Sequence, residues 1–95
     1  MISIVAEIRD KVQQVLRKRG VVRAGVFGSV ARGEQTECSD IDFLVELEKG
    51  RTLMDLSGLR LDLADLLGCN VDVVTAKALH PRLKDRILGE LVPIL

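Results

Sequence analysis

Apolar residues recur every three or four positions in three segments, and this spacing predicts three amphipathic helices. The first runs from about 3 to 19 and ends at Gly20, and the second covers 53–67 with a stripe of leucines. The third begins at Pro81, which suits the first position of a helix because its missing N–H has no partner there. The helical segments therefore account for nearly half of the chain.

Three short runs between these helices are rich in β-branched residues and predict strands over 21–27, 40–47 and 71–75. The segment 53–67 is long enough to be a crossover, so the second and third strands are expected to run parallel. The sequence predicts an α/β (α+β) fold, with a small mixed three-stranded sheet packed with helices in a single domain over 1–95.

Composition and charge narrow the function classes. The chain has 14 basic and 14 acidic residues and only two aromatic ones, Phe27 and Phe43. It lacks the basic surface and stacking platforms of a nucleic-acid-binding protein, so direct nucleic-acid binding is not expected. No apolar run is long enough for a membrane span, and the expected location is cytoplasmic. Cys38 and Cys69 have no metal-ligand spacing and are expected to be free thiols.

Candidate chemistry is concentrated in three aspartates. Asp40 and Asp42 are two residues apart on a predicted strand, so their side chains leave the same face with about 6–7 Å between their Cα atoms. Carboxylates in this arrangement can share hard divalent cations. Asp72 lies near the start of the parallel third strand and is the candidate third ligand. Two alternatives remain open: an Asp-x-Asp pair can serve as a turn, and Asp72 can face solvent from an edge strand.

Gly28 and Ser29 end the first strand, where a short helix from Ser29 to about Arg32 is expected to begin. Free N–H groups at such a helix start, together with the serine hydroxyl, attract phosphate. This turn can face the carboxylates only if the first strand runs antiparallel to the second and third strands. Ser29 can equally be a helix N-cap. Arg32 can reach a triphosphate or pair with an acid, and Glu34 excludes a Walker A loop because it stands where that motif needs lysine.

These motifs in order, 28–33, 39–45 and 71–74, resemble the minimal nucleotidyltransferases of the DNA polymerase beta superfamily, antitoxin type. The resemblance covers nearly the whole chain. It implies transfer of a nucleoside monophosphate, AMP from ATP, to a hydroxyl, with two Mg²⁺ ions (or Mn²⁺ as substitute). Asp40, Asp42 and Asp72 would be catalytic residues and metal ligands, and Gly28 and Ser29 would hold the nucleotide phosphates.

The implied partner is a small helical HEPN-type toxin whose tyrosine accepts AMP. Two other functions remain open, a non-catalytic binding antitoxin and a nucleotidyltransferase acting on a small molecule or an RNA end. The C-terminal residues 91–95 are apolar and leave two further alternatives. They can cover the sheet of their own domain, or they can dock on a partner or a second copy, so a homo-oligomer is possible.

Overall fold

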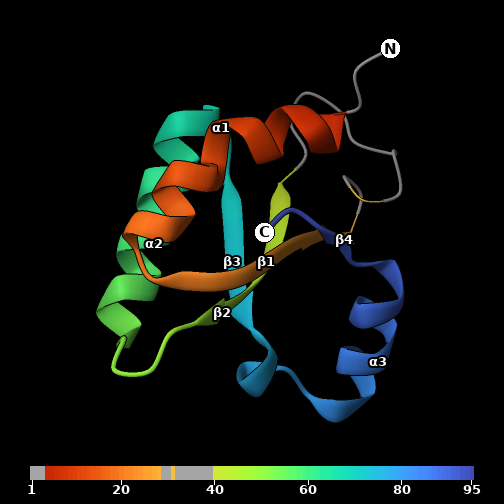
Figure 1. Ribbon diagram of the computed structural model, residues 1–95. Coiled ribbons are helices and arrows are strands. Elements are labelled where there is room, and N and C mark those ends of the chain that lie inside the picture. The colour runs from red at the N-terminus through yellow and green to blue at the C-terminus, as the bar shows by residue number, and fades with distance from the viewer. Residues whose placement is uncertain (1–3, 29–30, 32–39) are drawn as a thin grey trace.

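The computed structural model describes residues 4–28, 31 and 40–95. Three helices are present, α1 (Ile4–Lys18), α2 (Leu53–Leu67) and α3 (Pro81–Glu90), with a 3-10 turn η1 (Ala76–Ala78) before α3 (Figure 1). The strands are β1 (Val21–Phe27), β2 (Ile41–Leu47), β3 (Val71–Thr75) and β4 (Val92–Pro93). The predicted short helix from Ser29 to Arg32 lies outside the described residues.

The four strands form one mixed sheet in the order β3-β2-β1-β4. β2 and β3 are parallel and β1 is antiparallel to β2, as the sequence predicts. The expected number of three strands was wrong, because Val92 and Pro93 pair with Val26 and Gly25 of β1. Two residues are too few to give an alternating pattern, and proline is tolerated there because β4 is an edge strand.

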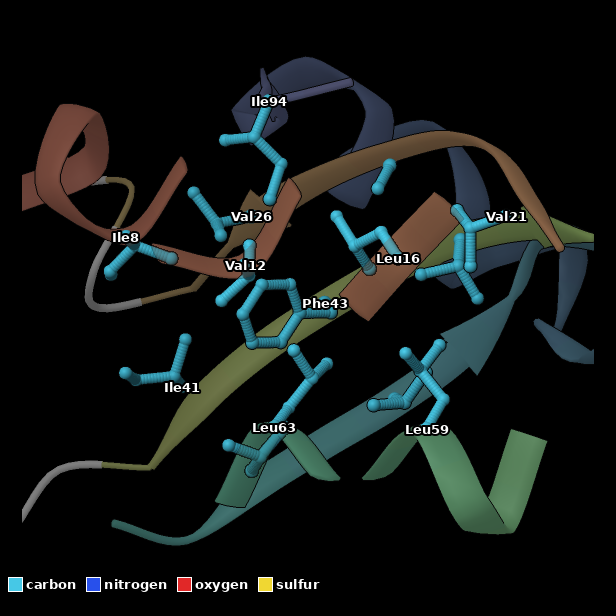
Figure 2. Packing of buried hydrophobic residues seen from close by; sticks show 14 residues of the cluster. Ile8, Val12, Leu16, Val21, Val26, Ile41, Phe43, Leu59, Leu63 and Ile94 are labelled. Carbon is cyan, nitrogen blue, oxygen red and sulfur yellow. The ribbon is translucent and has the colours of Figure 1, made fainter. Parts of the chain in front are cut away.

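The hydrophobic core lies on one face of the sheet, under α1 and α2 (Figure 2). Phe43 is fully buried, and Figure 2 shows its ring between Val12 of α1 and Leu63 of α2. Ile41, Phe43 and Val45 alternate along β2 and all point into this core. The intervening residues of β2, including Asp42, therefore point to the opposite face of the sheet, because successive side chains of a strand alternate.

The C-terminal residues cover the sheet of their own chain. Ile94 is only 2% exposed and belongs to the core, and its N–H donates to the carbonyl of Ala24 at 2.9 Å. Leu91 lies on the other face, where it fills the space that the side chain missing from Gly25 leaves open. The C-terminal segment therefore packs on both faces of the sheet. The structure supports the alternative in which this segment covers the sheet of its own domain.

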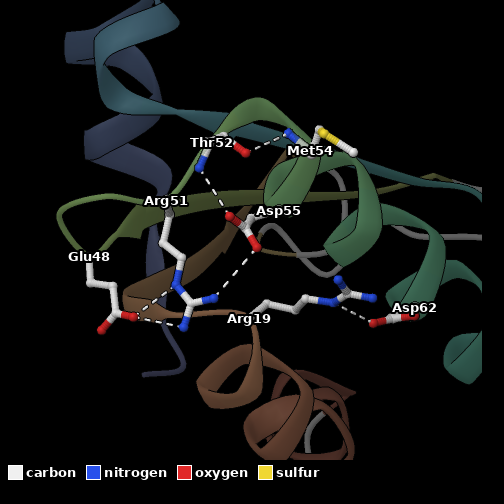
Figure 3. A network of polar contacts seen from close by, with 7 residues as sticks. All are labelled: Arg19, Glu48, Arg51, Thr52, Met54, Asp55 and Asp62. Atoms are coloured by element: carbon white, nitrogen blue, oxygen red, sulfur yellow. Dashed lines mark hydrogen bonds and ion pairs between the residues drawn. The ribbon is translucent and has the colours of Figure 1, made fainter.

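A polar network holds the first turn of α2, and a separate ion pair joins Arg19, which follows α1, to the C-terminal half of α2 (Figure 3). Thr52 and Asp55 form a capping box. The hydroxyl of Thr52 accepts a hydrogen bond from a backbone N–H of the first turn, and the carboxylate of Asp55 accepts one from the backbone N–H of Thr52. Arg51 contacts Glu48 at 2.7 Å and Asp55 at 3.5 Å, and Arg19 contacts Asp62 at 2.8 Å. The backbone N–H of Thr52 holds the pKa of Asp55 below its ordinary value, with Arg51 adding to the shift. The hydrogen bond to Glu48 raises the pKa of Arg51.

Single residues cap the helices. His80 accepts a hydrogen bond from the backbone N–H of Arg82 at its Nδ1 atom, so it caps α3 as a helix-entry residue. Gly68 ends α2 in the left-handed conformation at φ 68°. Among the described residues no helix combines the length and hydrophobicity needed to cross a membrane.

Candidate active site

The candidate carboxylates lie where β2 and β3 begin, on the sheet face away from α1 and α2. Asp42 of β2 and Asp72 of β3 are register partners in the parallel pair. Neighbouring strands are about 4.8 Å apart, so the two residues are adjacent on that face. Asp40 directly precedes β2 with the same parity as Asp42. Asp40 and Asp72 are exposed and Asp42 is half-buried. The side chains are therefore reachable from solvent.

Gly28 approaches Asp42 from β1. A Cβ atom built on Gly28 would lie 2.5 Å from Oδ2 of Asp42, so any side chain at this position would displace that carboxylate. Gly28 also has φ of 76°, a left-handed conformation that a residue with a side chain adopts only with strain. The first residue of the predicted phosphate-binding pair thus contacts the predicted metal ligand. This is the antiparallel arrangement that the sequence argument requires.

Two other predicted site residues, Ser29 and Arg32, lie outside the described residues. Within 4–28, 31 and 40–95, no three or more histidine, cysteine, aspartate or glutamate side chains are gathered closely enough to hold a metal ion. The backbone register brings Asp42 beside Asp72, and the role of these residues as metal ligands stays a prediction.

Two residues near the site were missed by sequence reasoning. Phe27 is the cross-strand partner of Asp42 and is half-buried, so an aromatic ring stands next to the carboxylates on their face. The position of Phe27 directly before Gly28 could have revealed it, because strand parity assigns it to the face of Asp42. Arg60 of α2 donates from Nε to the carbonyl oxygen of Val71 at 3.2 Å. It anchors the residue before Asp72, and no sequence signal indicated this contact.

Comparison with known proteins identifies the class. The model of the nucleotidyltransferase domain family matches residues 5–94. A Methanocaldococcus jannaschii protein, provisionally named a protein adenylyltransferase, is 53% identical over 89 residues, which are 94% of this chain and 96% of that protein. The protein adenylyltransferase MntA of Thermococcus cleftensis is 42% identical over 78 residues, 81% of this chain and 79% of that protein.

Solved structures agree in fold. One solved structure, provisionally described as a minimal nucleotidyltransferase, has a TM-score of 0.81 at 49% identity. The match covers 90% of this chain and 87% of that one. A Shewanella oneidensis complex of a tri-AMPylated HEPN toxin with its MNT antitoxin gives a TM-score of 0.74 at 19% identity, covering 97% of this chain and 72% of that one. At 19% identity the likeness shows the fold alone.

The carboxylate pair on a mixed sheet, with a glycine turn against it, therefore belongs to an enzyme of the nucleotidyltransferase class. The chain is a member of the nucleotidyltransferase domain family, as the match over 5–94 shows. Its similarity to proteins named adenylyltransferases, and to a solved structure described as a minimal nucleotidyltransferase, puts it among the minimal nucleotidyltransferases.

Proposed function

We propose that this chain transfers AMP from ATP to a tyrosine hydroxyl of a HEPN-type partner protein, in a metal-dependent reaction that makes it an antitoxin. The observation that carries the proposal is the register of Asp42 with Asp72, with Gly28 against Asp42, on a face that the core helices leave uncovered. The names of the relatives support adenylyl transfer as the reaction.

The donor set fits Mg²⁺, because carboxylate oxygens are the ligands that this ion prefers and it keeps water and phosphate oxygens as its others. Asp40 and Asp42 would hold two ions and Asp72 one of them. When bound, the ions lower the pKa of the acceptor hydroxyl and neutralise the pyrophosphate that leaves. Among the described residues, Asp42 is the carboxylate best placed to be shared, since it lies between Asp40 along β2 and Asp72 across the sheet.

The chain's own contribution to nucleotide binding is the turn after β1. Gly28 follows β1 in a left-handed conformation and lies against the carboxylate of Asp42. The backbone N–H groups and hydroxyl at 28–29 are proposed to bind the phosphates, and Arg32 is proposed to bind the triphosphate. These donors would hold the triphosphate next to the carboxylate of Asp42, because Gly28 lies against that carboxylate.

The acceptor is proposed to be a protein, because relatives that are 53% and 42% identical to this chain carry the name protein adenylyltransferase. The HEPN identity follows the Shewanella oneidensis complex, in which the toxin is AMPylated and bound to an MNT antitoxin.

The test is to mix the purified chain with a small HEPN-type helical protein, ATP and Mg²⁺, and to measure the intact mass of the partner. One or more added AMP units, mapped to a tyrosine and absent when the metal is chelated, are expected. The site variant for this assay is Asp42→Asn. Its matched control is Glu46→Gln, because Glu46 is an exposed acid on the same strand and of the same parity as Asp42. Stable binding and toxin inhibition with no gain in mass would instead indicate a non-catalytic antitoxin. Mass gain on an RNA end or a small molecule, but not on protein, would also contradict the proposal.

A further inference from the structure

Asp72 lies on a strand that has a neighbouring strand on one side only. Asp42, by contrast, is paired on both sides, with Phe27 of β1 and with Asp72 of β3. In the sheet that the structure describes, β3 is an edge strand of five residues, and Asp72 is the second of them. The ends of edge strands open most readily, because their backbone groups are paired on one side. A fixed position for Asp72 therefore requires a further contact at the start of β3.

A side chain of α2 supplies this contact. The carbonyl of Asn70 accepts from the backbone N–H of Ile41 in β2 at 3.1 Å. Successive carbonyls of a strand point in opposite directions, so the carbonyl of Val71 points away from β2, toward the open edge. There it accepts a hydrogen bond from Nε of Arg60 at 3.2 Å. Arg60 thus takes the place of a neighbouring strand, one residue before Asp72.

The other end of this contact is held by the core. Arg60 directly follows Leu59, and Leu63 lies one turn further along α2; both leucines are fully buried. They fix α2 against the sheet and leave the backbone of Arg60 little freedom. Val71 is only 5% exposed, and a buried carbonyl that loses its donor destabilises the conformation that buries it. The hydrogen bond therefore joins a fixed part of the core to the strand end that carries Asp72.

We propose that Arg60 is a positioning residue for the transfer reaction, which holds the start of β3 so that Asp72 keeps its place beside Asp42. The inference rests on the proposed function, in which Asp72 binds one of two cations and the turn at Gly28 binds the nucleotide. Gly28 and Asp72 lie on opposite sides of Asp42, because β1 and β3 flank β2. Loss of the Arg60 contact should therefore slow transfer without weakening nucleotide binding.

Two variants of Arg60 test this role. Arg60→Met removes the donor and keeps most of the apolar stem, whereas Arg60→Lys retains a charged donor for a contact that uses a single N–H. In AMP transfer to a HEPN-type protein, Arg60→Met is expected to lower kcat about ten- to hundredfold, as removal of a group that orients a metal ligand does. Arg60→Lys should recover most of this loss. Calorimetric titration with AMP-PNP and Mg²⁺ should give a Kd within about twofold of wild type for both variants.

Arg19→Met is the matched control. Arg19 also holds α2 through one guanidinium group, since its Nε donates to Asp62 at 2.8 Å. It precedes β1, however, and so lies at the end of that strand away from Gly28. Its substitution should affect the packing of α2 and leave kcat unchanged. An equal loss of kcat in Arg19→Met and Arg60→Met would show a general effect on stability and would overturn the inference.

Hydrogen exchange gives a second measurement, which does not depend on activity. Without metal or nucleotide, Arg60→Met should speed the exchange of the backbone amides at 71–73, while the amides of β1 exchange as in wild type. Unchanged exchange at 71–73, or an unchanged kcat of Arg60→Met, would overturn the inference. A wild-type chain that transfers no AMP would refute the proposed function, and the anchoring of β3 by Arg60 would then stand or fall on the exchange measurement alone.

Discussion

At the scale of single residues, the site is organised around Asp42. Asp42 is paired with Asp72 of β3 on one side and with Phe27 of β1 on the other. Gly28 then closes over its carboxylate. One residue of β2 therefore touches the proposed phosphate turn and adjoins the second carboxylate at the same time. Substitutions here should separate chemistry from folding.

Asp42→Asn is expected to abolish nucleotidyl transfer, since it removes an anionic ligand with almost no change in volume. Neighbouring carboxylates repel each other without a cation, so the melting temperature without metal should be unchanged or slightly raised. Activity assays and thermal unfolding of the variant, with Glu46→Gln as control, measure both effects. Full activity of a folded Asp42→Asn protein would remove Asp42 from the mechanism.

Gly28→Ala is expected to lower transfer at least about tenfold, because the new Cβ would collide with the carboxylate of Asp42 at a φ that disfavours side chains. Gly50→Ala is the matched control. Gly50 has φ of 91° with open space around it, so its substitution introduces backbone strain away from the acids. Each should lose about 1 kcal/mol of stability, and only Gly28→Ala should lose activity. Equal activity of the two variants would show that the close approach is unimportant.

At the scale of elements, α2 depends on its first turn. The capping box of Thr52 and Asp55 satisfies two backbone N–H groups, and Arg51 connects this turn to Glu48. The guanidinium groups of Arg51 and Arg19 lie over Gly20 and Gly58, where any side chain would displace them. The Arg19–Asp62 ion pair joins α2 to the end of α1 in addition to the core, and the first turn of α2 should respond to pH.

The pKa of Asp55 is lowered in the folded chain, above all by the backbone N–H of Thr52. A carboxyl group whose folded pKa is depressed stabilises the fold above its unfolded pKa, about 3.9, and loses that contribution as pH falls through the folded value. Wild type should therefore be more stable than Asp55→Asn at neutral pH, and the difference should shrink below about pH 4. Urea unfolding across this range measures it. A constant difference at all pH values would contradict the role of the charge.

At the scale of the whole molecule, one face of the sheet forms the core and the other carries the candidate site. α1 and α2 bury one face, and the other presents Asp42 and Asp72 to solvent. The C-terminal segment joins the two layers, because Ile94 enters the core while Leu91 packs over Gly25 on the open face. The end of the chain therefore supports the sheet that carries the site.

Ile94→Ala is expected to cost about 2–4 kcal/mol of stability, since it removes a side chain that is 2% exposed from the core. Leu88→Ala, at 47% exposure, should cost about 0.5 kcal/mol or less. Denaturant unfolding of both variants provides the comparison. If the two losses were equal, the C-terminal segment would not be part of the core.

The sequence alone predicts the helices and the three longer strands, because the helices have an apolar period of three to four residues and the strands are runs of five or more residues rich in β-branched side chains. The predicted ends differ from those of α1, α2 and β3 by a residue at most. It also determined the shared face of Asp40 and Asp42, which follows from strand parity alone. The parallel pairing of β2 and β3 followed from the length of the crossover. These features depend on residues that are close together along the chain.

The packing of the folded chain determines which distant residues meet. Val92 and Pro93 have no strand pattern of their own, and they become β4 because the edge of β1 offers backbone partners. The register of Asp42 with Asp72 is fixed by how Phe43 and Val73 pack under the helices, which the local pattern does not contain. The contact of Gly28 with Asp42 has the same origin. Pairing between strands depends on the shape of the shared core, so the sequence identified the candidate residues while packing determined their neighbours.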